Sequence, residues 1–158
     1  MKTNIGIPDS NRQSVEIELS KLLADEFLLV TKTRSAHWNV EGIDFYDKHK
    51  FFESQVHQLD EIVDSVAERI RSLGHYAPAT LKVFLELTHL MEVKRDKNNE
   101  SKTHIAELLA DHESIIIHCR ENIHYFGNEL KDFGSSDFIT NLMLVHEKMA
   151  YLLRAHMN

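Results

Sequence analysis

The chain has 158 residues, of which 42% are hydrophobic and 27% are charged, and only 5 are glycine and 2 proline. This length favours one domain that buries its own core, and the few glycines and prolines exclude long low-complexity segments. The formal net charge of −7 disfavours nucleic-acid binding through bulk charge and mildly favours cations.

The thiol content and the opening residues favour a cytoplasmic protein. The single cysteine, Cys119, cannot form an intramolecular disulfide, as expected in a reducing compartment. The first residues lack the apolar segment of a signal peptide, and no apolar run reaches the roughly 20 residues that span a bilayer. We therefore expect no membrane partner.

Two predicted helices occupy the first half of the chain, after a short tail at residues 1–9. The first runs from about residue 10 to 35 and opens with an Asp9-Ser10 cap after Pro8. The second runs from about 45 to 73, and Gly74 favours its end. Apolar side chains recur three and four residues apart in both helices. They are Val15, Leu19, Leu22, Leu23, Phe27 and Val30 in the first, and Phe52, Val56, Leu59, Val63, Val66, Ile70 and Leu73 in the second.

A long connection follows, at residues 75–99. Pro78 prevents one continuous helix there, but the apolar side chains predict a short helix inside the connection. These side chains are Leu81, Phe84, Leu85 and Leu87. The basic stretch from Lys94 to Lys102 predicts a solvated turn before the next helix.

The second half of the chain contains the third and fourth predicted helices, from about residue 101 to 126 and from about 136 to 156. The apolar stripe of the third is Ile105, Leu108, His112, Ile116, Cys119, Ile123 and Phe126, and that of the fourth is Phe138, Leu142, Val145, Met149 and Leu152. A long crossover between the second and third helices is typical of ferritin-like bundles. The sequence therefore predicts an all-α, ferritin-like four-helix bundle, in one domain, with a short extra helix in the crossover.

Four candidate metal ligands lie on the second predicted helix. His49, Glu53, Asp64 and Glu68 fall within roughly 100° of its circumference, at 100° per residue. They form two pairs, each with a spacing of four residues. A solvated face would also collect carboxylates, but imidazole nitrogen with carboxylate oxygen is a donor set that suits iron, manganese or zinc.

The two pairs cannot bind one ion within a single helix. His49 and Asp64 are separated by roughly 22 Å along the axis, at 1.5 Å per residue, whereas ligands lie about 2 Å from an ion. The pairs therefore serve separate sites or meet across a subunit boundary. If two copies of the helix cross antiparallel near Gln58, a two-fold axis creates two equivalent sites. His37 can then fold back onto its own His49/Glu53 pair.

The five-ligand spacing resembles that of Dps, the DNA-binding proteins from starved cells, or mini-ferritins. Trp38 follows the first histidine, and "HWNVEG", "AER", "DHESIIIHCRE" and "HEKMAYLLRAH" are also similar to that family. The resemblance implies a hollow shell of twelve subunits with ferroxidase centres at two-fold interfaces. One subunit would supply His37, His49 and Glu53, and its partner Asp64 and Glu68. Glu53 departs from the family, which more often has aspartate there.

The resemblance also implies the chemistry. These five residues would be both the catalytic residues and the metal ligands for oxidation of Fe(II), with hydrogen peroxide preferred over dioxygen. Ferric oxide would be stored in the cavity, which would protect the cell from oxidative stress. Zinc is a possible substitute for iron at the site.

Other residues are candidates for secondary roles. By resemblance, Asp137 would line an iron-entry pore, together with Asp132 and Glu129, although all three also fit a solvated cap region. Trp38 is a candidate for intercepting radicals or for simple packing. Cys119 is predicted to be a small buried apolar residue.

Two alternatives remain open from the sequence. An intrasubunit di-iron oxidase would use the pairs Glu86/His89 and Glu121/His124, which fit a Glu-x-x-His motif. A DNA-compacting shell would carry a vestigial metal site. Because the N-terminal segment offers only Lys2 and Arg12 as basic residues, we expect DNA binding to be weak or absent.

Overall fold

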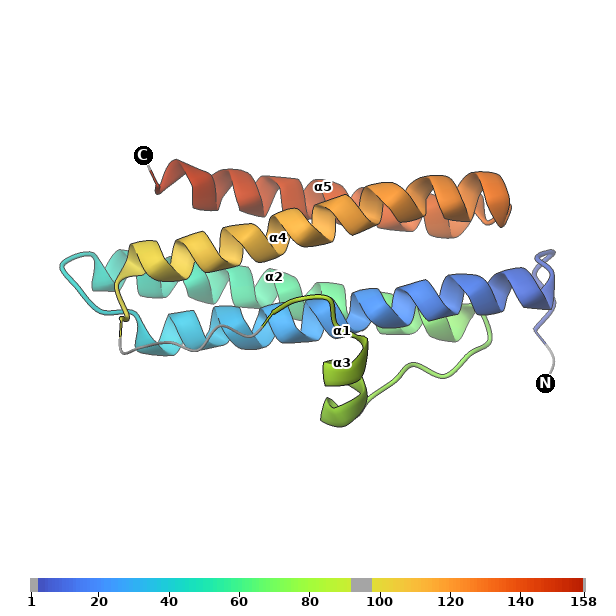
Figure 1. Cartoon of the computed structure of the whole chain (residues 1–158), viewed down its shortest axis with the longest axis horizontal. Coiled ribbons are helices and arrows are strands. Elements are labelled where there is room, and N and C mark those ends of the chain that lie inside the picture. Colours follow the sequence, from blue (N-terminus) through green and yellow to red (C-terminus); the bar gives the residue numbers. More distant parts are fainter. Residues whose placement is uncertain (1–2, 92–97, 158) are drawn as a thin grey trace.

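A computed structural model describes residues 3–91 and 98–157 of the chain. Four long helices form a bundle (Figure 1): α1 Asp9–Asn39, α2 Phe45–Ser72, α4 Ser101–His124 and α5 Phe133–Ala155. A short helix, α3 Leu81–Leu87, lies in the connection between α2 and α4, as predicted. One π-helical turn, η1 Tyr125–Glu129, extends α4 and was not predicted.

The helices pack as two antiparallel pairs. α1 lies against α2 and α4 against α5. The connection from α2 returns along the length of the bundle, so that α2 and α4 run in the same direction (Figure 1). α3 projects beside the middle of α1, where the ring of Phe84 stacks on that of Phe27 at 4.6 Å between centroids. The long crossover and the all-α fold are thus confirmed.

The core contains most of the apolar residues that were predicted to be buried from their spacing of three and four residues. In α1 and α2 the predicted stripes are buried, with only Phe27 and Val63 partly buried at their edges. The largest fully buried side chains include Phe52, Phe126, Leu19, Leu59, Ile70, Ile105 and Leu108. Cys119 is 2% exposed and packs as the predicted apolar residue.

The predicted stripe of the fourth helix was partly wrong. Val145 is 37% exposed, whereas Ile139, Met143 and Leu153 are buried. Apolar residues occupy nearly every side of this helix from Phe138 to Val145, so the period alone does not select the face that meets the core. The same rotation places a polar residue, His146, at 0% exposure.

Local chemistry explains where the helices begin and end. Gly74 has a φ of 93°, which lets the chain leave α2 in the left-handed conformation as predicted. α1 begins at Asp9 without a side-chain cap, and the Asp9 carboxylate instead accepts from Arg12 at 2.6 Å. α5 begins three residues before its predicted start, because Asp132 caps it through the backbone N–H of Ser135 at 2.9 Å.

Within the described ranges, no helix combines the length and apolarity that crossing a membrane requires. The first four residues of the predicted basic turn, 94–97, fall outside these ranges, and its last two, Ser101 and Lys102, already belong to α4.

Candidate metal centre

Two histidines, His37 near the end of α1 and His49 near the start of α2, form a reciprocal pair of hydrogen bonds. His37 donates from Nδ1 to the backbone carbonyl of His49 at 2.9 Å, and His49 donates from Nδ1 to the carbonyl of His37 at 2.8 Å. Their rings stack with centroids 4.0 Å apart and an interplanar angle of 26°. The two side chains are held by each other's backbone.

This reciprocal contact determines the protonation of both rings. A carbonyl oxygen can only accept, so each Nδ1 must carry the hydrogen. In the neutral imidazole the other nitrogen, Nε2, then has a lone pair for a metal ion. A histidine that ligates through one nitrogen commonly has its other nitrogen fixed in this way.

Glu53 lies one turn after His49 on α2. His37 and Glu53 line one hollow of about 370 Å³, together with Arg34, Trp38, Val56, His57 and Asp60. Oε2 of Glu53 lies 2.8 Å from the ammonium of Lys50, and that hydrogen bond lowers the pKa of the Glu53 carboxyl. Glu53 is therefore ionised near neutral pH. Trp38 is 67% exposed at the edge of the hollow.

The loop between α1 and α2 is anchored by the far end of the crossover. The backbone N–H of Glu41 donates to the carbonyl of Asn99 at 2.9 Å, and the hydroxyl of Ser101 donates to Asp44 at 2.6 Å. The Ser101 bond lowers the pKa of the Asp44 carboxyl. These contacts place the start of α4 beside the loop that positions His37 and His49.

The remaining predicted ligands lie elsewhere on the same chain. Asp64 and Glu68 are exposed on α2, about four turns beyond His49. The structure thus places His37, His49 and Glu53 at the same end of α2, without bringing one donor atom from each within 4.8 Å of the other two, and it leaves Asp64 and Glu68 on the surface. The single chain has the split arrangement that the spacing predicts.

The predicted pore residues differ in their surroundings. Asp132 is 1% exposed and accepts from the hydroxyl of Ser135 at 2.6 Å and from the guanidinium of Arg69 at 3.3 Å. Its carboxylate therefore caps α5 instead of facing water, because both oxygens have protein partners. Glu129 and Asp137 are exposed.

The two Glu-x-x-His motifs do not form an intrasubunit site. Glu86 lies 3.9 Å from Lys82 on the exposed side of α3, and its side chain is 61% exposed. The side chain of His124 is 71% exposed and lies 4.0 Å from Glu129. His89 instead reaches α1, where it meets Asp25.

A chain of buried polar groups lies in the core and was not predicted from the sequence. Nε2 of His146 on α5 lies 2.8 Å from Oε1 of Glu26 on α1, and its Nδ1 shares a hydrogen bond of 2.9 Å with Nδ1 of His112 on α4. All three residues are fully buried. The available signal was Asp25-Glu26 inside the apolar segment "LLADEFLLV", where a solvated face would not be expected.

Comparison with known proteins identifies the family. A family model described as a ferritin-like domain matches residues 17–158. DNA protection during starvation protein 2 of Bacillus anthracis is 30% identical over 148 residues, covering 94% of this chain and 99% of that protein. The chain belongs to the Dps family of ferritin-like proteins.

A further relative is similar to this Dps chain in sequence, and two solved structures are similar to it in fold. An uncharacterised low temperature-induced protein of Nostoc sp. is 38% identical over 154 residues, covering 98% of this chain and 86% of the relative. The crystal structure of a Dps protein from Bacillus brevis superposes with a TM-score of 0.87, at 25% identity, over 100% of both chains. DpsC from Streptomyces coelicolor reaches a TM-score of 0.94, at 24% identity, over 100% of this chain and 91% of that one.

Proposed function

We propose that this Dps chain is a ferroxidase and iron-storage protein whose metal centre is built by two subunits. The observation that carries the proposal is the stacked His37/His49 pair, in which both Nδ1 atoms are occupied and both Nε2 atoms remain for a metal ion. Glu53 adds an ionised carboxylate one turn away. Asp64 and Glu68 of a second copy would complete the centre.

The residues suit Fe(II) as a substrate. Imidazole nitrogens bind Fe(II), and anionic carboxylates favour the harder Fe(III) ion that oxidation produces. Two Fe(II) ions give one electron each to hydrogen peroxide, whose O–O bond breaks, and two protons complete two waters. This two-electron reduction releases no hydroxyl radical. We therefore propose hydrogen peroxide as the preferred oxidant and a protective role in oxidative stress.

A closed shell supplies the storage space. Dps homologues support a homo-oligomer, and we propose a dodecamer in which each two-fold interface carries two centres. Exposed Glu129 and Asp137 are the remaining candidates for an acidic iron-entry pore. The protein would act in the cytoplasm, where Fe(II) is present.

DNA protection would then come from removal of iron and peroxide. With a net charge of −7, the chain is not expected to retard supercoiled plasmid in a gel at low salt without divalent metal. Tight retardation under these conditions would favour the DNA-compacting alternative.

The proposed ferroxidase centre is tested by removing the partner's ligands. The double variant Asp64→Ala/Glu68→Ala should oxidise Fe(II) with stoichiometric peroxide at least about tenfold more slowly than the parent, because each centre loses two of its five protein ligands. Stopped-flow absorbance of the ferric product measures the rate. Asp47→Ala/Glu61→Ala is the matched control, since both residues are also exposed on α2. Equal rates for the parent and the first variant, with assembly unchanged, would reject the site.

A further inference from the structure

A second group of metal donors lies within one subunit, away from the His37/His49 pair. It consists of Asp25 on α1, His89 just after α3 and His118 on α4. One donor atom from each residue lies within 4.8 Å of the other two. Asp25 and His37 are separated by twelve residues of α1, or roughly 18 Å along the helix, so the two groups are distinct.

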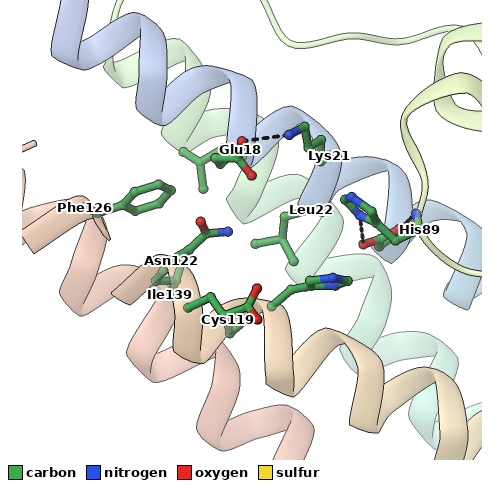
Figure 2. Close-up of a pocket in the computed structure, with 12 residues that line it drawn as sticks. Glu18, Lys21, Leu22, His89, Cys119, Asn122, Phe126 and Ile139 are labelled. Atoms are coloured by element: carbon green, nitrogen blue, oxygen red, sulfur yellow. Dashed lines mark hydrogen bonds and ion pairs between the residues drawn. The ribbon is translucent and has the colours of Figure 1, made fainter. Parts of the chain in front are cut away.

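The carboxylate of Asp25 is held in place by the chain that follows α3. Its Oδ1 accepts from the hydroxyl of Thr88 and from the backbone N–H of His89, both at 2.6 Å. Its Oδ2 faces the ring of His89 at 3.3 Å (Figure 2). Asp25 is 2% exposed, so this ionisable group is desolvated and oriented before any ligand arrives.

A role restricted to fastening the crossover would need only Asp25, Thr88 and His89. It would not explain His118, whose ring lies 4.5 Å from that of His89 between centroids. Nδ1 of His118 is buried and has no hydrogen-bond partner among the described residues. Two imidazoles beside one buried carboxylate form the donor set of a metal site.

The cavity around these residues is open enough for an ion and its water. It has a volume of about 210 Å³, and Glu18, Glu121 and Asn122 add oxygen atoms to its lining, beside Lys21, whose ammonium pairs with Glu18 at 2.7 Å. The net charge of the lining favours a cation. Cys119 also lines the cavity, but burial raises the pKa of its thiol to about 12, which keeps it protonated and a poor ligand.

We propose that Asp25, His89 and His118 bind a divalent transition-metal cation such as Zn²⁺ or Fe²⁺. Two histidines and one carboxylate leave coordination positions for water or a further oxygen donor. Two ligand atoms that each lie about 2.1 Å from one ion are at most roughly 4.2 Å apart. The donor atoms here lie within 4.8 Å of one another, so movements of the side-chain donor atoms by less than about 1 Å would bring them to ligand distance. The ion would join α1, α4 and the crossover.

Zinc binding to the assembled protein tests the proposal without any ferroxidase measurement. In the His37→Ala/His49→Ala background, isothermal titration with Zn²⁺ alone should still detect a site on each chain, and anomalous diffraction should locate it at Asp25. Saturation with Zn²⁺ should raise Tm by about 5 °C or more at a hundredfold excess over Kd. Zinc bound only outside this cavity would overturn the proposal.

Two variants separate metal binding from folding. His118→Ala should weaken Zn²⁺ binding more than about a hundredfold, because loss of a ligand costs more than loss of a residue that only supports a ligand. The control is His124→Ala, which should not weaken Zn²⁺ binding, since His124 lies exposed on the same helix. Asp25→Asn keeps an oxygen that accepts from Thr88 and His89 but loses the negative charge. If His118→Ala and Asp25→Asn bind Zn²⁺ as tightly as the background protein, these residues are not ligands.

Discussion

At the scale of single residues, two pairs of histidines lie in contrasting environments. His37 and His49 are partly exposed, and their Nδ1 atoms are fixed by backbone carbonyls. His112 and His146 are fully buried and depend on each other and on Glu26. The first pair is suited to exchange with solvent and to bind ions. The second pair is suited to hold the core in one arrangement, and it makes the fold sensitive to pH.

Glu53, where the resemblance to Dps leads us to expect aspartate, is a second feature at the residue scale. The longer side chain reaches Lys50, which forms an exposed ion pair with it. Such pairs are weak in water, so the carboxylate can leave Lys50 when an ion enters. The extra methylene is therefore compatible with the proposed metal binding.

We predict that stability falls on mild acidification because of His112. Burial, and then the nearby charge of His146, lower its pKa well below 6.5. Below pH about 6.5 the unfolded chain binds a proton here and the folded chain does not, so the free energy of unfolding decreases by up to about 1.4 kcal/mol per pH unit for this group. His112→Gln should reduce the dependence of Tm on pH between about 5 and 7.

The matched control for that change is His124→Gln, because His124 is exposed on the same helix. This variant should keep the pH dependence of the parent. A His112→Gln protein whose Tm declines with acid as steeply as that of the parent would show that other groups cause the loss.

At the scale of the helices, α5 depends on its first turn. The side chain of Asp132 accepts from the N–H and the hydroxyl of Ser135, and it faces Arg69 on α2. The capping side chain therefore connects the start of α5 with the second half of α2. This is also the part of α2 that carries Asp64 and Glu68. Lys131, just before it, has a φ of 57°, which turns the chain from η1 into α5.

Asp132→Ala should destabilise the protein by about 1–2 kcal/mol, because loss of an N-cap typically costs about 1 kcal/mol and Arg69 also loses a buried partner. Chemical unfolding monitored by circular dichroism measures the difference. Asp132→Asn retains an oxygen for the cap and should recover part of the loss. An alanine variant as stable as the parent would contradict the role of this cap.

At the scale of the whole molecule, the proposed metal centre requires an assembly of at least two subunits. One chain presents His37, His49 and Glu53 at one end of α2, and Asp64 and Glu68 roughly 22 Å further along. Several large apolar side chains near the first group are exposed, including Trp38, Ile43, Phe45 and Tyr46. In a two-fold assembly, the second copy would cover this surface and bring its own carboxylates to the histidines.

Complementation between two inactive variants tests the proposed assembly. We predict that equal co-expression of His37→Ala/His49→Ala with Asp64→Ala/Glu68→Ala restores about a quarter of the parent's Fe(II) oxidation. Random pairing makes half of the dimers mixed. In a mixed dimer, one of the two centres combines the intact histidines of one subunit with the intact carboxylates of the other, so about a quarter of all centres are complete. Stopped-flow absorbance of the ferric product measures the recovery.

Each variant expressed alone should stay inactive, and so should preassembled shells that are mixed without exchange of subunits. Activity of the co-expressed protein no higher than that of the single variants would mean that one chain does not complete the centre of another.

The sequence alone was sufficient for the four long helices, the short α3, the core faces of α1 and α2, and the separation of the ligand pairs. These features follow from local chemistry: a period of three and four residues, Gly74 at a helix end and a rise of 1.5 Å per residue. The exposed face of α5 was misjudged, since apolar residues surround that helix and the local pattern is ambiguous.

Only the tertiary structure decided which distant side chains meet. Asp25, His89 and His118 come from three separate segments, and no spacing in the sequence relates them. The same holds for Glu26, His112 and His146 in the core, and for Asp132, whose carboxylate turned inward as a cap. The physical reason is that periodicity reports which side of a helix is buried, whereas contacts between helices depend on how the helices pack against one another.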